Sequence, residues 1–365
     1  MRYKQYYLSE LVTIKYGKNQ KKVVSDIGEI PIYGTGGLMG YAKEALYDKP
    51  SVLIGRKGTI SKVKYIDHPF WTVDTLFYTI VNTDIIIPKY LYYLMSLIDF
   101  NNYNEGTTIP SLRTETLNRL QFDIPSLEEQ ELVLSYLNPI DDRINLNNEI
   151  NNNLFEQAKA LFKNWFVDYE PFSSDNAMPE NWRMGTVGDI IELHDSKRIP
   201  LSGSERDKME KIYPYYGATS LMDYVDNYLF DGIYLLLGED GTVVDDKGFP
   251  ILQYIDGKFW VNNHAHILTG KLGYSVEELY LLFSLTNIKS IVTGAVQQKV
   301  SQANLKKVPA IIPPVEVLKQ FDDVIQPIFA EIRNLRSENQ RLSSIRDSIL
   351  PKLMSGNIDV SNIDI

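Results

Sequence analysis

The sequence of 365 residues contains no cysteine and only 4 histidines. The absence of cysteine excludes a disulfide scaffold, a cysteine-based zinc site and a thiol nucleophile, and it fits the reducing environment of the cytoplasm, where we expect the protein to reside. No run of eighteen apolar residues is present, and the first residues lack the apolar core of a signal peptide. We therefore expect neither a membrane span nor export.

The chain also lacks the excess of basic residues that DNA-binding proteins usually carry. Its 37 Lys and Arg residues face 47 Asp and Glu residues, which leaves a net charge of −10. The acid is unevenly distributed: residues 1–125 carry +3, residues 126–170 carry −6, residues 171–312 carry −5 and residues 313–365 carry −2. A local basic surface therefore remains compatible with the first segment.

The two halves of the chain repeat one another. Residues 31–59 align with residues 214–242 at a constant offset of 183, and 12 of these 29 pairs are identical. Chance would give about two identities at ordinary residue frequencies. Farther along, the offset becomes 188 and pairs Gly106 with Gly294. A period this long indicates the duplication of a whole domain and not a solenoid.

Each half begins with a loop-rich segment in which short β-type runs alternate with turn residues. We expect strands at 51–54, 71–81, 233–237, 251–255 and 259–268, and amphipathic helices at 91–100 and 276–285. These elements predict an α+β fold with two β-rich domains, at 1–125 and 171–312. The segment 126–170 is then a central helical spacer, and 313–365 is a distal helical spacer with a tail.

Both spacers have a coiled-coil pattern. Steps of three and four residues connect nine positions within 137–165, and the same steps connect nine positions within 325–353. One such helix cannot bury its apolar stripe alone. We therefore expect the two long helices to form an antiparallel coiled coil with a pseudo-two-fold axis, with Leu154 and Leu342 in its seam.

Two asparagines interrupt the apolar seam of this pattern, and two prolines affect where its helices can begin. Asn151 and Asn339 each stand at the middle of nine seam positions, where they either meet and set the register or point to water. Pro139 and Pro327 are equivalent, and proline is harmless only in the first turn of a helix. We therefore expect a break before each proline, with Asn138 as a helix cap and a long helix of about 40 Å after it.

The order of these segments resembles the specificity subunit of type I restriction–modification systems. The residues that carry the resemblance are the motif IPSLEEQ at 124–130 and its shorter copy IPPVE at 312–316, together with GTTIPSLR at 106–113, LFKNWF at 161–166, WVNNHAH at 260–266 and GAVQQKVS at 294–301. The second copy departs from the motif at Val317 and Leu318, where Glu-Gln is usual. The resemblance covers essentially the whole chain.

The resemblance implies a division of labour. The two β-rich domains are target recognition domains, each reading one half of a bipartite double-stranded DNA sequence. The long helices act as a ruler and dock two methyltransferase subunits, which two restriction subunits can join. Helices of about 40 Å correspond to about 12 base pairs between the domain centres, so we expect two short half-sites with an unread spacer.

A catalytic role is the competing hypothesis. A stand-alone DNA methyltransferase needs a cofactor-binding glycine motif and an Asn/Asp-Pro-Pro-aromatic motif, and the segment 34–40 and Pro313-Pro314 fit neither. We expect no cofactor and no bound metal. His264 and His266 would share one strand face, but packing or hydrogen bonding explains two histidines better than metal ligation. A scaffold that does not bind DNA remains a third alternative.

Loops at equivalent places in the two halves are the candidate DNA contacts. Loop one covers 33–40 and 216–223, loop two covers 56–59 and 239–242, and loop three covers 107–113 and 297–301. In the first half the candidates are Tyr33, Thr35, Arg56, Lys57, Thr59, Thr107, Thr108, Ser111 and Arg113. In the second half they are Tyr216, Thr219, Ser220, Glu239, Asp240, Thr242, Gln297, Gln298, Lys299 and Ser301.

The chemistry of loop two reverses between the halves, since Arg56-Lys57 corresponds to Glu239-Asp240 within the same Gly and Thr frame. Arginine can bind guanine through two hydrogen bonds, a carboxylate can accept one from cytosine, and glutamine reads adenine. Loop two of the second half is therefore either a different base reader or an ordinary exposed turn. The basic residues Lys15, Lys18, Lys21 and Lys22 either contact phosphates or form a solvated face.

Overall fold

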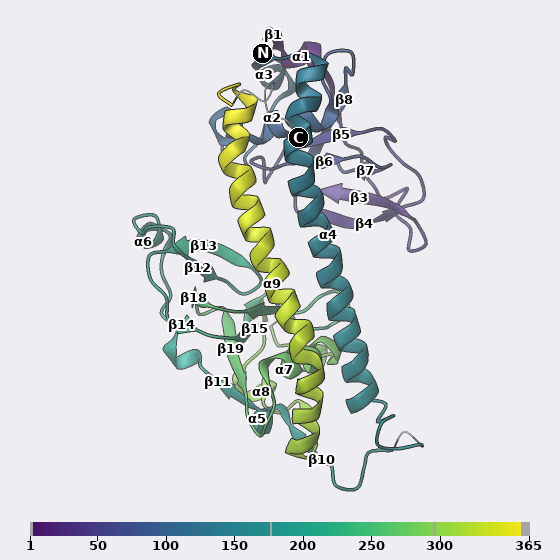
Figure 1. Cartoon of the computed structure of the whole chain (residues 1–365), viewed down its shortest axis with the longest axis vertical. Helices are drawn as coiled ribbons and strands as arrows, with labels where there is room; N and C mark the ends of the chain where they lie inside the picture. The colour runs from purple at the N-terminus through teal and green to yellow at the C-terminus, as the bar shows by residue number, and fades with distance from the viewer. Residues whose placement is uncertain (1–2, 176, 295–296, 359–365) are drawn as a thin grey trace. The chain divides into compact units, whose positions relative to one another are not determined.

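A computed structural model describes residues 3–175, 177–294 and 297–358 (Figure 1). The chain divides into two compact units, unit 1 with residues 1–145 and 339–365, and unit 2 with residues 146–338. Residues 295–296 of the motif at 294–301 and residues 359–365 of the tail lie outside the described residues. Within the described ranges, no helix combines the length and the apolar character that a membrane crossing needs.

Unit 1 contains the first β-rich domain. Its elements are β1 (Lys4–Tyr7), α1 (Leu8–Leu11), β2 (Val12–Tyr16), β3 (Ile30–Gly34), β4 (Gly37–Ala42), β5 (Ser51–Gly55), β6 (Val63–Ile66), β7 (Trp71–Thr72), β8 (Leu76–Val81), α2 (Pro88–Ser96), the 3-10 helix η1 (Phe100–Tyr103), α3 (Thr114–Asn118) and β9 (Gln121–Ile124). The strands form sheets in the orders β2-β8-β5-β6, β4-β3-β7 and β1-β9. All five residues of β5 are buried, as expected for an apolar strand inside a sheet.

Unit 2 contains the second β-rich domain. Its elements are β10 (Arg183–Thr186), α5 (Val187–Ile190), β11 (Ile191–Leu193), η2 (Asp195–Lys197), α6 (Gly203–Arg206), β12 (Tyr213–Tyr216), β13 (Leu221–Val225), β14 (Phe230–Asp231), β15 (Tyr234–Gly238), β16 (Asp240–Gly241), β17 (Leu252–Ile255), β18 (Lys258–Val261), β19 (Ala265–Gly270), α7 (Val276–Leu285), η3 (Lys289–Ile291), β20 (Gln298–Lys299), α8 (Gln302–Leu305) and β21 (Pro309–Ile312). The sheet orders are β11-β19-β15-β17, β13-β12-β18-β14, β10-β21 and β16-β20.

The duplication extends to the strand register. Leu53 pairs with Tyr78 in unit 1, and its counterpart Leu236 pairs with Ile267 in unit 2. The β3–β4 ladder shifts register before Tyr33, and the β12–β13 ladder shifts register before the equivalent Tyr216. The two β-rich domains therefore share one plan, as the sequence repeat predicts.

Several expected boundaries are wrong in detail. The runs 71–81 and 259–268 each form two strands, because a turn at 73–75 and one at 262–264 redirect the chain into a different sheet. The first amphipathic helix begins three residues earlier than expected, at Pro88, and ends at Ser96. Proline suits that first helical position because its missing N–H would have no helical partner there.

The two long helices, α4 (Leu127–Phe166) and α9 (Val315–Met354), run without a break through Pro139 and Pro327, so the expected interruption is wrong. Each has 40 residues and is about 60 Å long, which exceeds the expected 40 Å. An internal proline costs about 3 kcal/mol. Side chains next to each proline are fully buried, Leu137 in α4 and Ile325 and Phe329 in α9, and this burial outweighs the local cost.

The start of α4 explains the motif at 124–130. The backbone N–H of Ser126 donates to Glu129 Oε2 at 3.0 Å, and the Glu129 N–H donates back to Ser126 Oγ at 3.3 Å, which is a capping box. Gln130 is fully buried, and its amide binds the backbone of Ile85, Ile87 and Pro125. The motif therefore both starts the helix and attaches it to the β-rich domain, and Asn138 lies inside the helix and does not cap it.

The two long helices pack together with antiparallel direction in each unit. In unit 1, Arg346 Nη1 lies 2.9 Å from Asp141 Oδ1, and Asn339 Nδ2 lies 3.5 Å from the Ile144 carbonyl oxygen. In unit 2, Asn147 Nδ2 donates to Glu338 Oε2 at 3.0 Å. Residue numbers rise along α4 as they fall along α9, as an antiparallel pair requires.

The expected contact between Asn151 and Asn339 stays a prediction. Asn339 faces Ile144, which precedes Asn151 by two helical turns. Leu154 packs against the core of unit 2, and Leu342 is half-buried.

Three phenylalanines of α4 pack within unit 2. Phe162 and Phe166 are 3% exposed and contact Phe321 of α9, while Phe155 stacks on Tyr280 of α7. The apolar flank of α4 is thus buried by the second helix and the second β-rich domain.

Candidate nucleic-acid interface

Loops two and three lie side by side in unit 1. Lys57 and Ser111 form an antiparallel β-bridge, and the Leu112 N–H donates to the Arg56 carbonyl oxygen at 2.9 Å. The Gly58 N–H donates to the Pro110 carbonyl oxygen at the same distance. Two segments more than fifty residues apart in the sequence therefore form one surface.

Unit 2 builds the same surface with different side chains. β16 pairs with β20 through Asp240 and Lys299, and the Val300 N–H donates to the Glu239 carbonyl oxygen at 2.8 Å. Asp240 and Lys299 are the residues that the offsets of 183 and 188 match to Lys57 and Ser111. The backbone pairing of loops two and three is thus retained while the side chains at the paired positions differ.

Loop one joins loop two in unit 1. A cavity of about 260 Å³ is lined by Tyr33, Thr35 and Thr59, with Lys62 and Lys64 also in its wall. The Lys64 ammonium lies 4.8 Å from the centre of the Tyr33 ring, a cation–π distance. Candidate residues from two separate loops therefore share one basic pocket.

At the corresponding place in unit 2, a glutamine side chain binds the backbone of loop one. Lys64 pairs with Leu53, and Gln253 pairs with the equivalent Leu236, so Gln253 occupies the Lys64 position. Its amide donates to the Gly217 carbonyl oxygen of loop one at 3.0 Å. Unit 2 has a cavity of about 830 Å³ at loops two and three, and Thr242, Gln297 and Gln298 are part of its wall.

Most of the predicted contact residues are accessible. The exposed ones are Lys18, Lys21, Lys22, Lys57, Thr59, Thr107, Thr108, Arg113, Thr219, Ser220, Thr242, Gln297, Gln298 and Lys299. The partly buried ones are Tyr33, Thr35, Arg56, Ser111, Tyr216, Glu239, Asp240 and Ser301. Backbone contacts tie the basic run to the domain, because the Lys18 N–H donates to Thr72 and the Lys18 carbonyl accepts from the Trp71 indole.

Several of the predicted residues already bind other protein groups. Arg56 donates to the Asp74 carbonyl oxygen at 2.7 Å, and Arg113 forms an ion pair with Glu105 at 3.1 Å. Ser301 caps α8 by accepting from the Asn304 N–H. These contacts leave the side chains less free to reach a base than the sequence implied.

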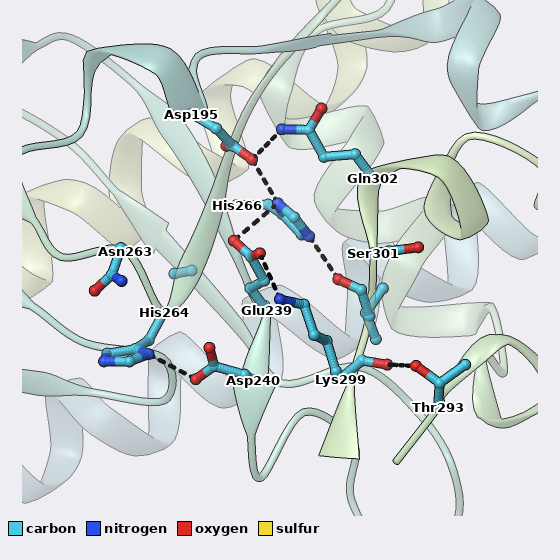
Figure 2. A network of polar contacts seen from close by, with 12 residues as sticks. Asp195, Glu239, Asp240, Asn263, His264, His266, Thr293, Lys299, Ser301 and Gln302 are labelled. Carbon is cyan, nitrogen blue, oxygen red and sulfur yellow. Dashed lines mark hydrogen bonds and ion pairs between the residues drawn. The ribbon is translucent and has the colours of Figure 1, made fainter. Parts of the chain in front are cut away.

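Glu239 and its neighbours form a buried ionic network (Figure 2). Arg198 Nη1 lies 2.7 Å from Glu239 Oε2, and Arg198 Nη2 lies 3.5 Å from Asp195 Oδ2. His266 Nδ1 lies 2.6 Å from the same Asp195 oxygen. Burial alone would raise the pKa of Asp195, but the hydrogen bond and charge of His266 outweigh it and hold that pKa below its usual value.

Asp195, Glu239 and His266 also have ligand atoms close enough to share a metal ion, since these atoms lie within 4.8 Å of one another. The donor set does not fit that role well, because Arg198 already supplies a cation to both carboxylates. A metal ion would have to displace the guanidinium group.

The structure corrects one prediction about this region and adds two residues that sequence reasoning did not identify. His264 and His266 do not share a strand face, because β19 begins at Ala265 and His264 belongs to the preceding turn. The His264 side chain is 46% exposed, and its Nδ1 lies 2.6 Å from Asp240 Oδ1 with the other ring nitrogen turned away (Figure 2). Asp195 and Arg198 were missed because no local motif marks them.

The comparison with known families agrees with this architecture. A family model described as the type I restriction modification DNA specificity domain matches residues 2–156 and again residues 179–344. The chain belongs to this family. It is a DNA specificity subunit of a type I restriction–modification system and is itself non-catalytic.

Relatives of this specificity subunit extend over most of its length. The specificity subunit of the type I restriction enzyme MjaIX from Methanocaldococcus jannaschii is 26% identical over 87% of this chain and 80% of its own length. The HindI specificity subunit from Haemophilus influenzae is 24% identical over 88% of this chain and 89% of its own length.

The fold also occurs in a solved structure. The crystal structure of the type I restriction–modification S subunit from M. genitalium aligns with 97% of this chain and 96% of its own, with a TM-score of 0.55 and 17% identity. The tandem arrangement of two β-rich domains and two long helices is therefore a fold that this specificity subunit has in common with that protein.

Proposed function

We propose that this specificity subunit reads a bipartite double-stranded DNA site, one half with the β-rich domain of each unit. The two long helices dock two methyltransferase subunits, and restriction subunits join that complex to give the complete type I enzyme. The residue ranges 1–125 and 171–312 are the two recognition domains, with 126–170 and 313–365 as the helical spacers. The absence of cysteine favours a cytoplasmic location for this assembly.

The observation that carries this proposal is the shared ladder between loops two and three. Lys57 opposite Ser111 and Asp240 opposite Lys299 are the same backbone pair in two copies of one domain. A scaffold that keeps its backbone and changes its exposed side chains suits two different half-sites, since direct readout depends on side-chain donors and acceptors.

The uneven charge of the two β-rich domains suggests that the methyltransferase subunits contribute part of the DNA affinity. The first domain carries +3, and its Lys62 and Lys64 stand at the loop-one pocket. The second domain carries −5 and gives no electrostatic attraction to phosphates. We therefore propose that the isolated chain binds DNA weakly and that the methyltransferase subunits supply much of the phosphate contact.

A base-substitution experiment tests the reading of the second half-site. We expect Gln298→Ala combined with Lys299→Ala to reduce the discrimination between matched and mismatched bases in one half-site by about 10- to 100-fold, the effect of losing one bidentate base contact. The measurement is competition binding by the complex of the chain with its methyltransferase subunits, on duplexes with single substitutions across the target that methylome sequencing defines.

The matched control is Lys306→Ala combined with Lys307→Ala, which removes exposed charge outside the three loops. These two substitutions should leave base discrimination unchanged in both halves. Equal losses in both half-sites, or no loss in either after the loop-three substitutions, would contradict the assignment of loop three to one half-site.

A further inference from the structure

His266 lies beneath loops two and three of unit 2 and has no exposed surface. Its Nδ1 is 2.6 Å from Asp195 Oδ2, and its Nε2 is 2.8 Å from the carbonyl oxygen of Val300 (Figure 2). A backbone carbonyl only accepts hydrogen bonds, so Nε2 must carry a proton. Val300 directly follows the candidate readers Gln298 and Lys299, so this bond holds loop three.

The other ring nitrogen also carries a proton. Asp195 accepts from the Ile267 N–H at 2.9 Å and from the Gln302 amide at 2.6 Å, and the Arg198 guanidinium lies beside it. Donors on three sides favour the carboxylate form of Asp195, which can only accept from His266. Two acceptors on one ring make His266 an imidazolium.

The charges around His266 balance with that proton in place. The buried groups that face the ring are the carboxylates of Asp195 and Glu239, with Glu239 Oε2 at 3.6 Å, and the guanidinium of Arg198. These three sum to −1, which the imidazolium neutralises. The remaining charged neighbour, Lys299, is half exposed and lies 3.5 Å from Glu239, where water screens it.

Unit 1 has uncharged or aromatic groups at two of the same positions. Tyr16 pairs with Phe77 between β2 and β8. The β11–β19 ladder ends with Leu193 opposite Leu268, and continuing its register by two residues matches Asp195 of η2 with His266. The Tyr16 and Phe77 rings meet edge to face at 5.1 Å. Arg56, the counterpart of Glu239, lies 5.1 Å from the Tyr16 ring. Residues at the same three positions therefore lie beneath loop two in both units. In unit 1 the counterpart of His266 is Phe77, which has no ionisable group.

We propose that Asp195 and His266 are positioning residues for DNA recognition by unit 2, and that they hold loop three against loop two only while His266 carries both ring protons. This inference rests on the proposed function. Loss of either proton leaves a ring nitrogen facing an acceptor, which releases either Val300 or Asp195. Base discrimination in the half-site of unit 2 then falls as the pH rises, while discrimination in the half-site of unit 1 does not.

The first test compares the two half-sites across pH. Competition binding by the complex with methyltransferase subunits, on duplexes substituted in one half at a time, is measured from pH 6 to 9. We expect discrimination in the half-site of unit 2 to fall about tenfold as the pH rises, because a ring nitrogen that faces an acceptor without a proton releases loop three and with it one base contact. The double variant Asp195→Tyr/His266→Phe, which carries the residues of unit 1, should show a flat profile.

The control is His194→Gln. His194 also belongs to unit 2 and hydrogen-bonds Thr269, but no described contact joins its side chain to loops two or three. Burial lowers the pKa of His194, which disfavours its charged form. We therefore expect His194→Gln to show the same dependence of base discrimination on pH as the parent protein. A parallel pH response of both half-sites, or a double variant that keeps the parental profile, would overturn the positioning role.

The second test needs no variant of the network. In the full chain labelled with ¹⁵N-histidine, only four rings give signals, and His194→Gln assists their assignment. The ring of His266 should show a proton on both nitrogens at neutral pH, and a neutral ring with one proton would overturn the inference. Absence of sequence discrimination in both half-sites at every pH contradicts the proposed function instead.

Discussion

Unit 1 and unit 2 use one backbone plan with opposite side-chain chemistry. Beneath loop two, unit 1 has Tyr16 and Phe77 with a cation–π contact to Arg56, where unit 2 has Asp195 and His266 in an ionic network. Each set satisfies its own members, so the glycine frame and the ladder above it stay the same. The comparison teaches that this scaffold tolerates complete exchange of a supporting cluster, provided that the whole cluster changes together.

The attachment of each β-rich domain to the long helices shows the same reversal. In unit 1, Lys89 of α2 lies 3.4 Å from Asp141 of α4. In unit 2, Glu277 stands at the equivalent place in α7 and lies 3.1 Å from Arg333 of α9. A tyrosine joins each pair, since Tyr93 donates to Asp141 and Tyr254 donates to Glu277, both at 2.6 Å.

The largest expected effect comes from breaking one of these buried attachments. Asp141→Ala leaves Lys89, Arg346 and the Tyr93 hydroxyl without their shared acceptor. We expect a loss of about 3–5 kcal/mol in the free energy of unfolding, the usual cost of removing one partner from a buried ion pair. Urea denaturation followed by circular dichroism measures it.

The neighbouring Asp142 is exposed, so Asp142→Ala is the control and should change the stability by no more than about 0.5 kcal/mol. Glu277→Ala should match Asp141→Ala in size. If one of the two cost less than about 1 kcal/mol, the two attachments would not be energetic equivalents despite their similar geometry.

A moderate effect is expected at the helix position where the units differ in charge. Burial raises the pKa of Glu278 to about 8, and unit 1 has the fully buried Tyr90 at the equivalent place. The pKa in the folded state lies above the ordinary value of 4.5, so the folded chain holds the proton more tightly. Stability from this group is present below pH 4.5 and is lost as the pH rises through 8.

Glu278→Gln should therefore be more stable than the parent at pH 9 by on the order of 1–3 kcal/mol and should equal it near pH 5. Urea midpoints of both proteins at the two pH values measure this difference, with the exposed Glu316→Gln as the control. A difference that is the same at both pH values would show that Glu278 does not take up a proton on folding.

The smallest effect is expected at a glycine of loop one that packs against a methionine in both units. A Cβ atom at Gly34 would lie 2.4 Å from the Met39 Sδ, and a Cβ atom at Gly217 would lie 2.4 Å from the Met222 Sδ. A thioether at the end of a flexible side chain moves at small cost, so we expect Gly34→Ala and Gly217→Ala each to destabilise by less than about 1 kcal/mol.

Thermal unfolding measures these two variants beside Gly36→Ala, whose Cβ would meet no atom within 4 Å. Equal values for Gly34→Ala and Gly217→Ala would support identical packing of loop one in both units. A difference of more than about 1 kcal/mol would contradict equal packing of loop one in the two units.

Much of the fold could be predicted from the sequence, because it depends on short-range patterns and on internal comparison. The offset of 183 predicted that loops one and two recur, and the seam spacing predicted two long helices that pack antiparallel. The helix breaks at Pro139 and Pro327 were wrong, since the local cost of proline is visible in a sequence but the burial that outweighs it is not.

The candidate site was less predictable. Loop residues were selected by exposure and hydrogen-bonding type, and most are indeed exposed. Glu239, however, is bound by Arg198, which lies 41 residues earlier, and Asp240 is bound by His264. A sequence does not show which partner a charged residue has when that partner comes from a distant loop or turn.

By itself, the sequence determined that this protein is a duplicated specificity subunit with two β-rich domains and two long helices. Only the tertiary structure decided that loops two and three form one surface, and that Asp195 and His266 support it in unit 2 where Tyr16 and Phe77 do so in unit 1. The physical reason is the distance along the chain: Asp195 and His266 are 71 residues apart and meet only when two strands pair.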